Sequence, residues 1–412
     1  MTRIFYGWVV VGGAFLVLFT AYGSQYAFGV FFSALLDEFG WSRAQLSGVF
    51  SLYAFLYCVL GLGAGRLTDR WGPRVVVALG GVFLGMGLAG MSQVSTLWQP
   101  YISYGVVAGI GMSTAYVPCT ATVAKWFVRQ RGLALGVASS GGSLGTFALP
   151  IAAAALVAEL GWRQAYLVFG GGVLLILNLV ALLMTRDPEL LGLLPDGERR
   201  PSSTQEGPTQ GVHWTLARAV RTGAFWLLFG VFAATWMPVF IPMVHAIPFA
   251  RDLGISPLYA ATVISALGIA AVFGRVVMGG VSDKIGRKWA LGLSIGLQVV
   301  AFLGFLAVDG LPTLYLVALG FGFSYGAIST LFAAMVSDFF GREEAGGLVG
   351  FLFTLAAPAA ALGPVGAGWI YDVAGSYAWA FGLSALLNGT SLILLLFARP
   401  PTEVLDRPEQ SI

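Results

Sequence analysis

The segment GRLTDRWGPR at residues 65–74 recurs in modified form as GGVSDKIGRK at residues 279–288, 214 positions later. Both copies fit the pattern G-x-x-x-D-[RK]-x-G-[PR]-[RK], and each follows a long apolar run. A weaker repeat pairs GLALG at residues 132–136 with GGLVG at residues 346–350, at the same separation. The chain therefore consists of two related halves.

The chain around these repeats is strongly apolar. Hydrophobic residues make up 58% of its 412 positions and charged residues only 10%, with a mean hydropathy of +0.84. Soluble domains are about 25% charged, so this composition excludes a water-exposed globule. The 57 glycines favour close helix packing in lipid. Cys58 and Cys119 lie inside apolar runs and are interpreted as small packing residues.

Twelve stretches are long and apolar enough to cross a membrane, since a spanning helix needs about 20 mostly apolar residues. They lie at residues 7–32, 46–65, 75–94, 99–123, 132–157 and 164–184, and at residues 224–248, 258–280, 289–308, 312–336, 346–370 and 377–398. The first run is too long for a signal-peptide core and lacks a clear cleavage site. The sequence therefore predicts an all-α membrane protein with twelve transmembrane helices in two pseudo-symmetric six-helix bundles.

The basic residues predict the orientation of these helices. If both termini are cytoplasmic, 18 of the 22 Lys and Arg residues fall on the cytoplasmic side. Only Arg43, Arg163 and Arg251 fall in outer loops, and Arg275 lies inside the eighth span. Cytoplasmic loops of membrane proteins carry such an excess. We therefore expect a multi-pass protein of the cell (inner) membrane with both termini in the cytoplasm.

One long polar stretch separates the two halves. Its centre, residues 195–211, is rich in Pro, Ser, Gly, Gln and Glu, a composition typical of flexible linkers. The expected organisation is an N-terminal half at residues 1–185, a cytoplasmic linker at 186–222, a C-terminal half at 223–399 and a cytoplasmic tail at 400–412.

The repeated loop signature resembles that of the major facilitator superfamily, over the whole chain. Further motifs are similar to those of the monocarboxylate transporter family and its bacterial relatives, the oxalate:formate antiporter group. They are YGW at residues 6–8, FGWS at 39–42, KWF at 125–127, RGLALG at 131–136 and SGGSLG at 140–145. The resemblance implies alternating access, in which the two halves move around a central site near the bilayer midplane.

The signature loops are expected to take part in gating. Their glycines permit a tight turn and close helix approach, and Asp69 could pair with basic residues of the neighbouring bundle to hold the cytoplasmic side closed. A charged loop that only satisfies the positive-inside rule is the alternative. The residues are Gly65, Asp69, Arg70 and Gly72 in the first copy and Gly279, Asp283, Gly286 and Arg287 in the second.

Arg275 is the candidate for substrate binding. A guanidinium in the membrane interior costs from about 3 to more than 10 kcal/mol, so it needs a compensating partner. No acidic residue lies in the middle of a span, and a substrate carboxylate would fit a guanidinium through two hydrogen bonds. Position alone is equally compatible with snorkelling to the inner headgroups. In the resembling families an arginine at this point binds the substrate carboxylate, which favours the binding role.

The chain departs from these families at two positions. Many animal members carry a carboxylate one turn before the arginine, where this chain has Ala271. They also carry a lysine in the first span after Tyr-Ala-Phe-Pro, whereas YAF at residues 26–28 is followed here by Gly29 and Val30. Both ionisable groups usually assigned to proton handling are absent, so the resemblance does not imply a coupling mechanism.

Aromatic and weakly polar residues of the expected cavity-lining spans complete the predicted pocket. Tyrosine is the most informative type, because its hydroxyl needs a partner inside the membrane. Any single aromatic residue is equally compatible with packing or with facing lipid. The candidates are Tyr22, Gln25, Tyr26, Tyr116, Tyr325, Phe332 and Phe353.

His245 is the candidate proton carrier, as the one histidine within a predicted span. Histidine titrates near physiological pH, and Asp252 lies seven residues later as a potential partner. The nearby Pro238, Pro242 and Pro248 are expected to disturb the helix. The alternative is an interfacial histidine bonded to water or backbone.

The sequence lacks a catalytic constellation. GGSLG at residues 141–145 formally matches a nucleophile elbow, but it lies inside a predicted membrane helix, where its glycines indicate packing. We therefore expect no enzyme, cofactor, metal, nucleic acid or obligatory protein partner. The predicted function is proton-coupled symport of small monocarboxylates such as lactate or pyruvate. Carboxylate exchange of the oxalate:formate type is the alternative, and a non-transporting membrane sensor is less favoured.

Overall fold

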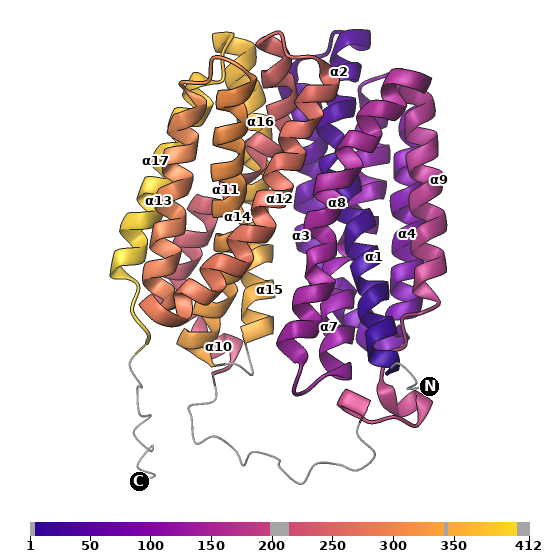
Figure 1. Cartoon of the computed structure of the whole chain (residues 1–412), viewed down its shortest axis with the longest axis vertical. Coiled ribbons are helices and arrows are strands. Elements are labelled where there is room, and N and C mark those ends of the chain that lie inside the picture. Colours follow the sequence, from indigo (N-terminus) through magenta and orange to yellow (C-terminus); the bar gives the residue numbers. More distant parts are fainter. Residues whose placement is uncertain (1–4, 198–213, 342–344, 402–412) are drawn as a thin grey trace, which may run out of the picture.

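The computed structural model describes residues 5–197, 214–341 and 345–401 as two bundles of helices (Figure 1). The first bundle contains α1 (Tyr6–Tyr26), α2 (Phe28–Phe39), α3 (Arg43–Trp71), α4 (Pro73–Gly90), α5 (Trp98–Pro100), the π-helical η2 (Tyr101–Ala108), α6 (Gly109–Ser113), α7 (Tyr116–Trp126), α8 (Arg131–Leu160) and α9 (Trp162–Ala181). After the short α10 (Leu216–Ala219), the second contains α11 (Gly223–Asp252), α12 (Pro257–Ile285), α13 (Arg287–Phe305), α14 (Leu311–Phe340), α15 (Ala345–Leu355), α16 (Ala357–Ala374) and α17 (Ala378–Phe397).

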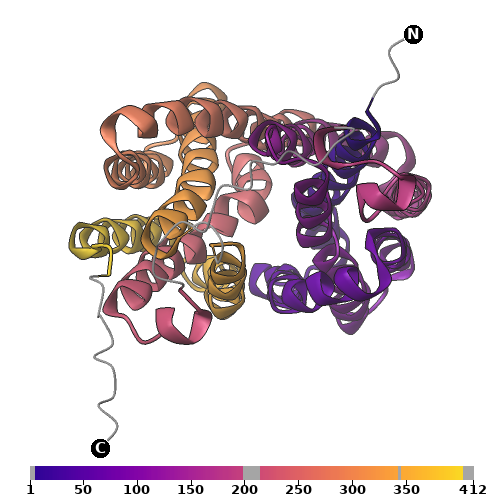
Figure 2. The same cartoon turned by 90° about the horizontal axis from the view of Figure 1, so that it is seen from below.

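The predicted number of spans is confirmed. Eleven spans of the described chain are long and apolar enough to cross a membrane, with α1 and α2 together forming the first. Helices α15 and α16, bent by 40° at their junction, pass the same test together and supply the twelfth. Figure 2 shows the first bundle in indigo and magenta beside the second in orange and yellow.

Two of the breaks inside spans precede a proline. The fourth span is interrupted at Thr114 and Ala115, just before Pro118, and the eleventh at Ala356, just before Pro358. Proline lacks the N–H that would bond to the carbonyl four residues earlier, so each of these two breaks lies where a backbone hydrogen bond is already missing. The break in the fourth span places Tyr116 at the first position of α7.

The repeated signature folds in the same way twice. Gly72 ends α3 with φ +82°, and Gly286 ends α12 with φ +87°. Each donates its backbone N–H four residues back, to the carbonyls of Thr68 and Ser282. A left-handed φ is strained for residues other than glycine, so the predicted tight turn explains both glycines. We call the end of the molecule that holds these turns the signature end.

The two bundles are joined at the end opposite the signature turns, which we call the far end. Here Gly368 of α16 packs on the first turn of α3, where an added Cβ would lie 2.7 Å from the carbonyl of Arg43. The carboxylate of Asp372 accepts hydrogen bonds from the backbone N–H groups of Arg43 and Ala44, at 2.9 and 2.8 Å. A side chain of the second bundle thus caps a helix of the first, where the helix dipole favours negative charge.

Candidate functional site

Arg275 lies in α12 of the second bundle and reaches across to the first. Its Nη1 donates a hydrogen bond to Ser143 Oγ of α8 at 2.8 Å. Within the described chain, no carboxylate forms an ion pair with its guanidinium, and four of the five N–H donors of this group have no protein acceptor. The side chain is thus directed into the interface between the bundles, and most of its hydrogen-bonding capacity is unused.

Close packing of α12 against α14 fixes the position of Arg275. An added Cβ at Gly274 would lie 2.0 Å from the carbonyl oxygen of Phe323, and one at Gly326 would lie 2.0 Å from that of Ala271. The two backbones therefore touch in the turn just before Arg275, and on either side of Tyr325. Ala271, where the resembling families carry a carboxylate, lies within this contact and is buried.

The four predicted tyrosines gather around Arg275. The hydroxyls of Tyr26 and Tyr325 lie 3.2 Å apart and join the two bundles. The side chains of Tyr22, Tyr26 and Tyr116 lie within electrostatic range of the Arg275 guanidinium. Tyr116 is 48% exposed although it lies within the fourth span, so this group of residues borders an open space rather than packed protein.

The other predicted pocket residues are Phe332, Phe353 and Gln25, and the two phenylalanines pack on neighbouring aromatic rings. The rings of Phe332 and Phe353 pack on Phe232, with centroids 4.4 and 4.8 Å away. Phe353 also packs on Trp236, whose ring faces that of Tyr325 at 6.3 Å. These aromatics therefore form a wall behind Tyr325.

Gln25 is also buried, and its side-chain amide has no hydrogen-bond partner among the described residues. No hydrogen bond joins it to Arg275 within that part of the chain.

Sequence reasoning missed two members of the site. Tyr57 of α3 lies near Tyr22, Tyr26 and Tyr325. Ser143 belongs to the GGSLG motif, whose glycines do pack as expected: added Cβ atoms at Gly141 and Gly145 would lie 2.2 and 2.0 Å from carbonyl oxygens of α1. The signal for Ser143 was its place between two packing glycines, which fixes where its hydroxyl lies.

A second polar cluster joins the bundles at the far end, around Arg43. Its guanidinium lies 2.6 Å from the Asp252 carboxylate, donates to the Tyr377 hydroxyl at 2.7 Å and stacks 3.6 Å from the centre of the Tyr371 ring. A further ion pair, Arg251 with Asp37 at 2.7 Å, also crosses between the bundles. The sequence indicated Arg43 only as an outer-loop cation.

His245 is fully buried behind this cluster, in a helix that continues through all three nearby prolines. Its Nδ1 lies 2.9 Å from the Tyr377 hydroxyl, and its Nε2 lies 2.9 Å from the Pro364 carbonyl and 3.1 Å from Ser47 Oγ. Asp252 pairs with Arg43, and no hydrogen bond or ion pair joins it to His245 within the described residues. The two predicted partners are linked only through Arg43 and Tyr377. The three prolines do not interrupt the helix, although each removes one backbone hydrogen bond.

Ion pairs at the signature end stay within one bundle. Asp69 lies 3.6 Å from Lys125, which also contacts Asp187 at 3.5 Å, and Arg287 pairs with Asp338 at 2.8 Å. No ion pair between the bundles is found there in the described part of the chain. The expected close approach of helices is found at Gly65, where an added Cβ would lie 3.0 Å from Val117. It is not found at Gly279, where an added Cβ would meet no atom within 4 Å.

The remaining signature residues Arg70 and Asp283 are exposed at the same end. Among the described residues, cross-bundle ion pairs therefore join the bundles at the far end and not at the signature end.

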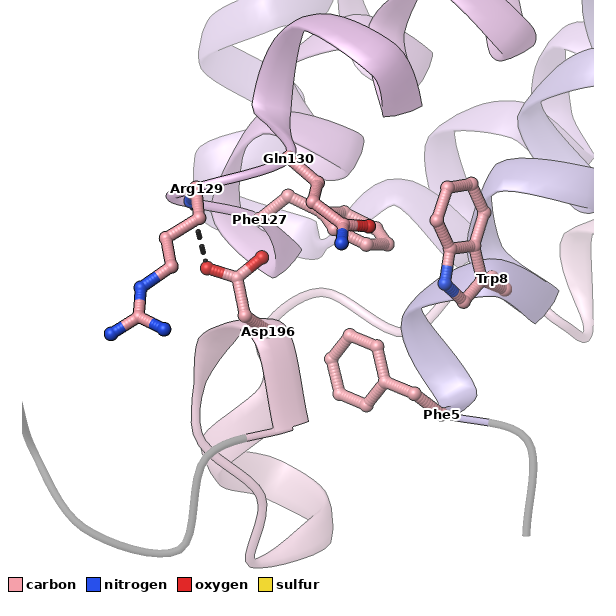
Figure 3. Close-up of a pocket in the computed structure, with 6 residues that line it drawn as sticks. All are labelled: Phe5, Trp8, Phe127, Arg129, Gln130 and Asp196. Carbon is pink, nitrogen blue, oxygen red and sulfur yellow. Dashed lines mark hydrogen bonds between the residues drawn. The ribbon is translucent and has the colours of Figure 1, made fainter. Parts of the chain in front are cut away.

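A cavity lies away from Arg275, at the signature end of the first bundle (Figure 3). This cavity of about 290 Å³ is lined by Phe5, Trp8, Phe127, Arg129, Gln130 and Asp196. Asp196 Oδ2 accepts hydrogen bonds from the backbone N–H groups of Val128 and Arg129, at 3.0 and 2.8 Å. The start of the predicted linker is thus anchored to the connection between α7 and α8. No group of His, Cys, Asp and Glu side chains that could hold a metal ion occurs within the described chain.

Comparison with known proteins gives one consistent picture. The model of the Major Facilitator Superfamily matches residues 14–248 and 238–411. Monocarboxylate transporter 12 of Rattus norvegicus is 28% identical, over 96% of this chain and 85% of that protein. Monocarboxylate transporter 4 of Mus musculus is 28% identical, over 95% and 83%, and monocarboxylate transporter 13 of Rattus norvegicus is 27% identical, over 99% and 95%.

Solved structures share the fold. The bacterial homolog of the human lysosomal transporter Spinster, in an inward-facing and occupied conformation, superposes with a TM-score of 0.71 at 16% identity. The match covers 97% of this chain and 96% of that one. The unoccupied inward-facing form gives a TM-score of 0.70.

Proposed function

The chain belongs to the Major Facilitator Superfamily, and we propose that it is a secondary transporter of small monocarboxylates of the lactate or pyruvate type. One observation carries the proposal: the Arg275 guanidinium lies between the bundles without a described carboxylate partner. A cation in such a place requires an anion, and a carboxylate matches its geometry through paired hydrogen bonds. The similarity to proteins named monocarboxylate transporters supports this substrate class.

Surrounding residues support a small substrate with one negative charge. Arg275 is the only basic residue inside a predicted span. Tyr22, Tyr26, Tyr116 and Tyr325 offer neutral hydroxyls around it, and the aromatic wall suits a short alkyl group. A second carboxylate would stay unpaired in a low-dielectric site, at a cost of several kcal/mol.

Alternating access accounts for the two ends of the molecule. The excess of Lys and Arg supports a cytoplasmic signature end, with both termini in the cytoplasm of a multi-pass inner-membrane protein. The far end, closed by Arg43, Asp252 and Asp372, is then the outer gate. The structure would correspond to the inward-facing state, and breaking these contacts would open the site to the outside.

The hydrogen bonds of His245 support a role in proton coupling. Because Arg43 donates to the Tyr377 oxygen, the Tyr377 hydrogen is free to bond His245 Nδ1. The Nε2–H then donates to the Pro364 carbonyl, which assigns the neutral Nε2–H tautomer. A proton on Nδ1 would oppose the Tyr377 hydrogen and add a second positive charge near Arg43. Protonation would therefore weaken the closed outer gate, as a symporter loading its proton from outside requires.

Carboxylate exchange of the oxalate:formate type is the competing function. In the relatives that bind a dicarboxylate, a lysine in the eleventh span faces the arginine of the eighth. The eleventh span of this chain, residues 346–370, contains no basic residue. The second cation that such a substrate needs is thus missing, which favours a monocarboxylate.

Uptake by purified protein in proteoliposomes tests the proposal. Labelled lactate, pyruvate, formate and oxalate are offered with and without an inward proton gradient. Uptake of lactate or pyruvate that increases with the gradient is expected, because an inward-moving anion must overcome about 2.3 kcal/mol per charge per 100 mV of interior-negative potential. Gradient-independent exchange of oxalate for formate would favour the competing function.

A further inference from the structure

The hydroxyl of Ser143 differs from those of its neighbours on α8. Ser140 donates to the Val137 carbonyl and Thr146 to the Gly142 carbonyl, both within the helix. Such bonds satisfy a hydroxyl inside a membrane helix without any other group. Ser143 makes no such bond: its oxygen accepts from Arg275 Nη1 at 2.8 Å, and its hydrogen has no acceptor among the described residues. Since Ser143 is 4% exposed, bulk water offers little compensation.

The position of this donor is fixed by the helix that carries it. Gly141 and Gly145, two residues to either side, hold α8 against α1 at backbone contact. Gly142 packs on the ring of Tyr22, which itself belongs to the Arg275 group. The uncommitted hydrogen therefore lies beside the guanidinium, in a place set by helix packing rather than by a flexible loop.

We propose that Ser143 selects monocarboxylates that carry an oxygen on the carbon next to the carboxylate. Arg275 Nη1 carries two N–H bonds. One donates to Ser143, and the other would donate to an oxygen of the substrate carboxylate. Because these bonds diverge by about 120°, two acceptors at about 2.8 Å lie about 4.8 Å apart. This inference rests on the proposed function and adds a specificity residue to the same site.

A 2-hydroxy or 2-oxo oxygen fits between these two positions. This oxygen lies about 2.7 Å from the nearer carboxylate oxygen, and a hydrogen bond from Ser143 to it would also span about 2.7 Å. Because the sum of the two distances is larger than the separation of about 4.8 Å between the carboxylate oxygen and the Ser143 oxygen, one substrate oxygen can bridge them. The Ser143 oxygen would keep its bond from Arg275 while its hydrogen gains an acceptor. Lactate and pyruvate have this oxygen, whereas propionate has the same carbon chain without it. The site would therefore leave the Ser143 donor unsatisfied when propionate is bound.

The test measures inhibition of labelled lactate uptake by unlabelled lactate and by propionate, in proteoliposomes of wild type and of Ser143→Ala. The ratio of the two inhibition constants does not depend on how much protein is folded. It is expected to favour lactate in the wild type and to fall about tenfold in Ser143→Ala. If Ser143→Ala does not fold, Ser143→Cys replaces it in the test. Its thiol is a weak donor, so this variant should also lose most of the preference for lactate. Ser140→Ala is the matched control on the same helix and should keep the wild-type ratio.

The outcomes distinguish failure of the proposed role of Ser143 from failure of the proposed substrate class. Equal weakening of both acids in Ser143→Ala would mean that Ser143 only positions Arg275, which overturns the specificity role. An unchanged ratio with unchanged affinities would overturn it as well. Wild-type protein that binds neither acid would refute the proposed substrate class, and this inference with it.

Discussion

Asp252 lies 2.6 Å from Arg43 and joins the end of α11 in the second bundle to the start of α3 in the first. The two side chains are 32% and 13% exposed, whereas the other cross-bundle pair, Asp37 with Arg251, is 61% and 32% exposed. Exposed pairs contribute little because solvent screens them, so the Arg43 pair is expected to dominate. Arg43 also bonds Tyr377, whose hydroxyl meets His245. The proposed gate and the proposed proton carrier are therefore neighbours.

Replacing Arg43 should open the far end. Arg43→Gln removes the ion pair with Asp252 and leaves that carboxylate without its cation, so the population of molecules open at the far end should rise about tenfold. Spin labels at the exposed residues Leu160 and Leu258, at the far ends of α8 and α12, report the separation of the bundles. The longer distance should gain population in Arg43→Gln.

Arg163→Gln is the matched control for this experiment. Arg163 pairs with Glu38 at 2.8 Å, but both residues belong to the first bundle. Its replacement should leave the label distances unchanged. If Arg43→Gln and Arg163→Gln behaved alike, the Arg43 pair would not be the contact that closes the far end.

Removing the titratable group of His245 should uncouple transport from protons. His245→Gln should weaken uptake driven by a proton gradient about tenfold or more, and should affect exchange of labelled for unlabelled lactate far less, since exchange moves no net proton. His213→Gln is the control, because His213 is the other histidine of the chain; it lies outside the described residues. Equal loss of both activities, or of neither, would argue against His245 as the proton carrier.

The single cation at the site predicts selectivity by charge. At neutral pH, lactate, pyruvate and propionate should compete for uptake of labelled lactate at concentrations at least tenfold lower than oxalate, malonate and succinate. A dianion bound to Arg275 would keep one charge unpaired. Oxalate that competed as well as lactate would require a second cationic site, which the described residues around Arg275 do not contain.

The sequence was sufficient for the fold because the fold depends on local signals. Apolar runs of about 20 residues and turn glycines such as Gly72 and Gly286 each act within a few neighbouring residues. The breaks before Pro118 and Pro358 were not predicted. The repeat then identified equivalent positions in the two halves. Arg275 was identifiable for the same reason, since an isolated charge inside an apolar run is visible without any contact.

Contacts between the bundles could not be predicted in the same way. Ser143, Tyr57 and Arg43 are ordinary residues for their positions, and they matter only because helices distant in sequence place Arg275, the tyrosines and Asp252 beside them. The expected pairing of His245 with Asp252 was based on their separation of seven residues along one helix. Their observed partners lie more than 100 residues away: Tyr377, in the same bundle as His245, and Arg43, in the other bundle from Asp252.

The most direct test of the central claim is uptake of labelled lactate by Arg275→Ala and Arg275→Lys in proteoliposomes, compared with wild type at equal amounts of monodisperse protein. Loss of a buried charged partner costs about 2–5 kcal/mol, so Arg275→Ala should take up lactate at least about 30-fold more slowly. Arg275→Lys should recover little, because an ammonium keeps the charge and loses the paired hydrogen bonds. Near-normal uptake by Arg275→Ala would contradict the account, since the substrate carboxylate would then bind elsewhere.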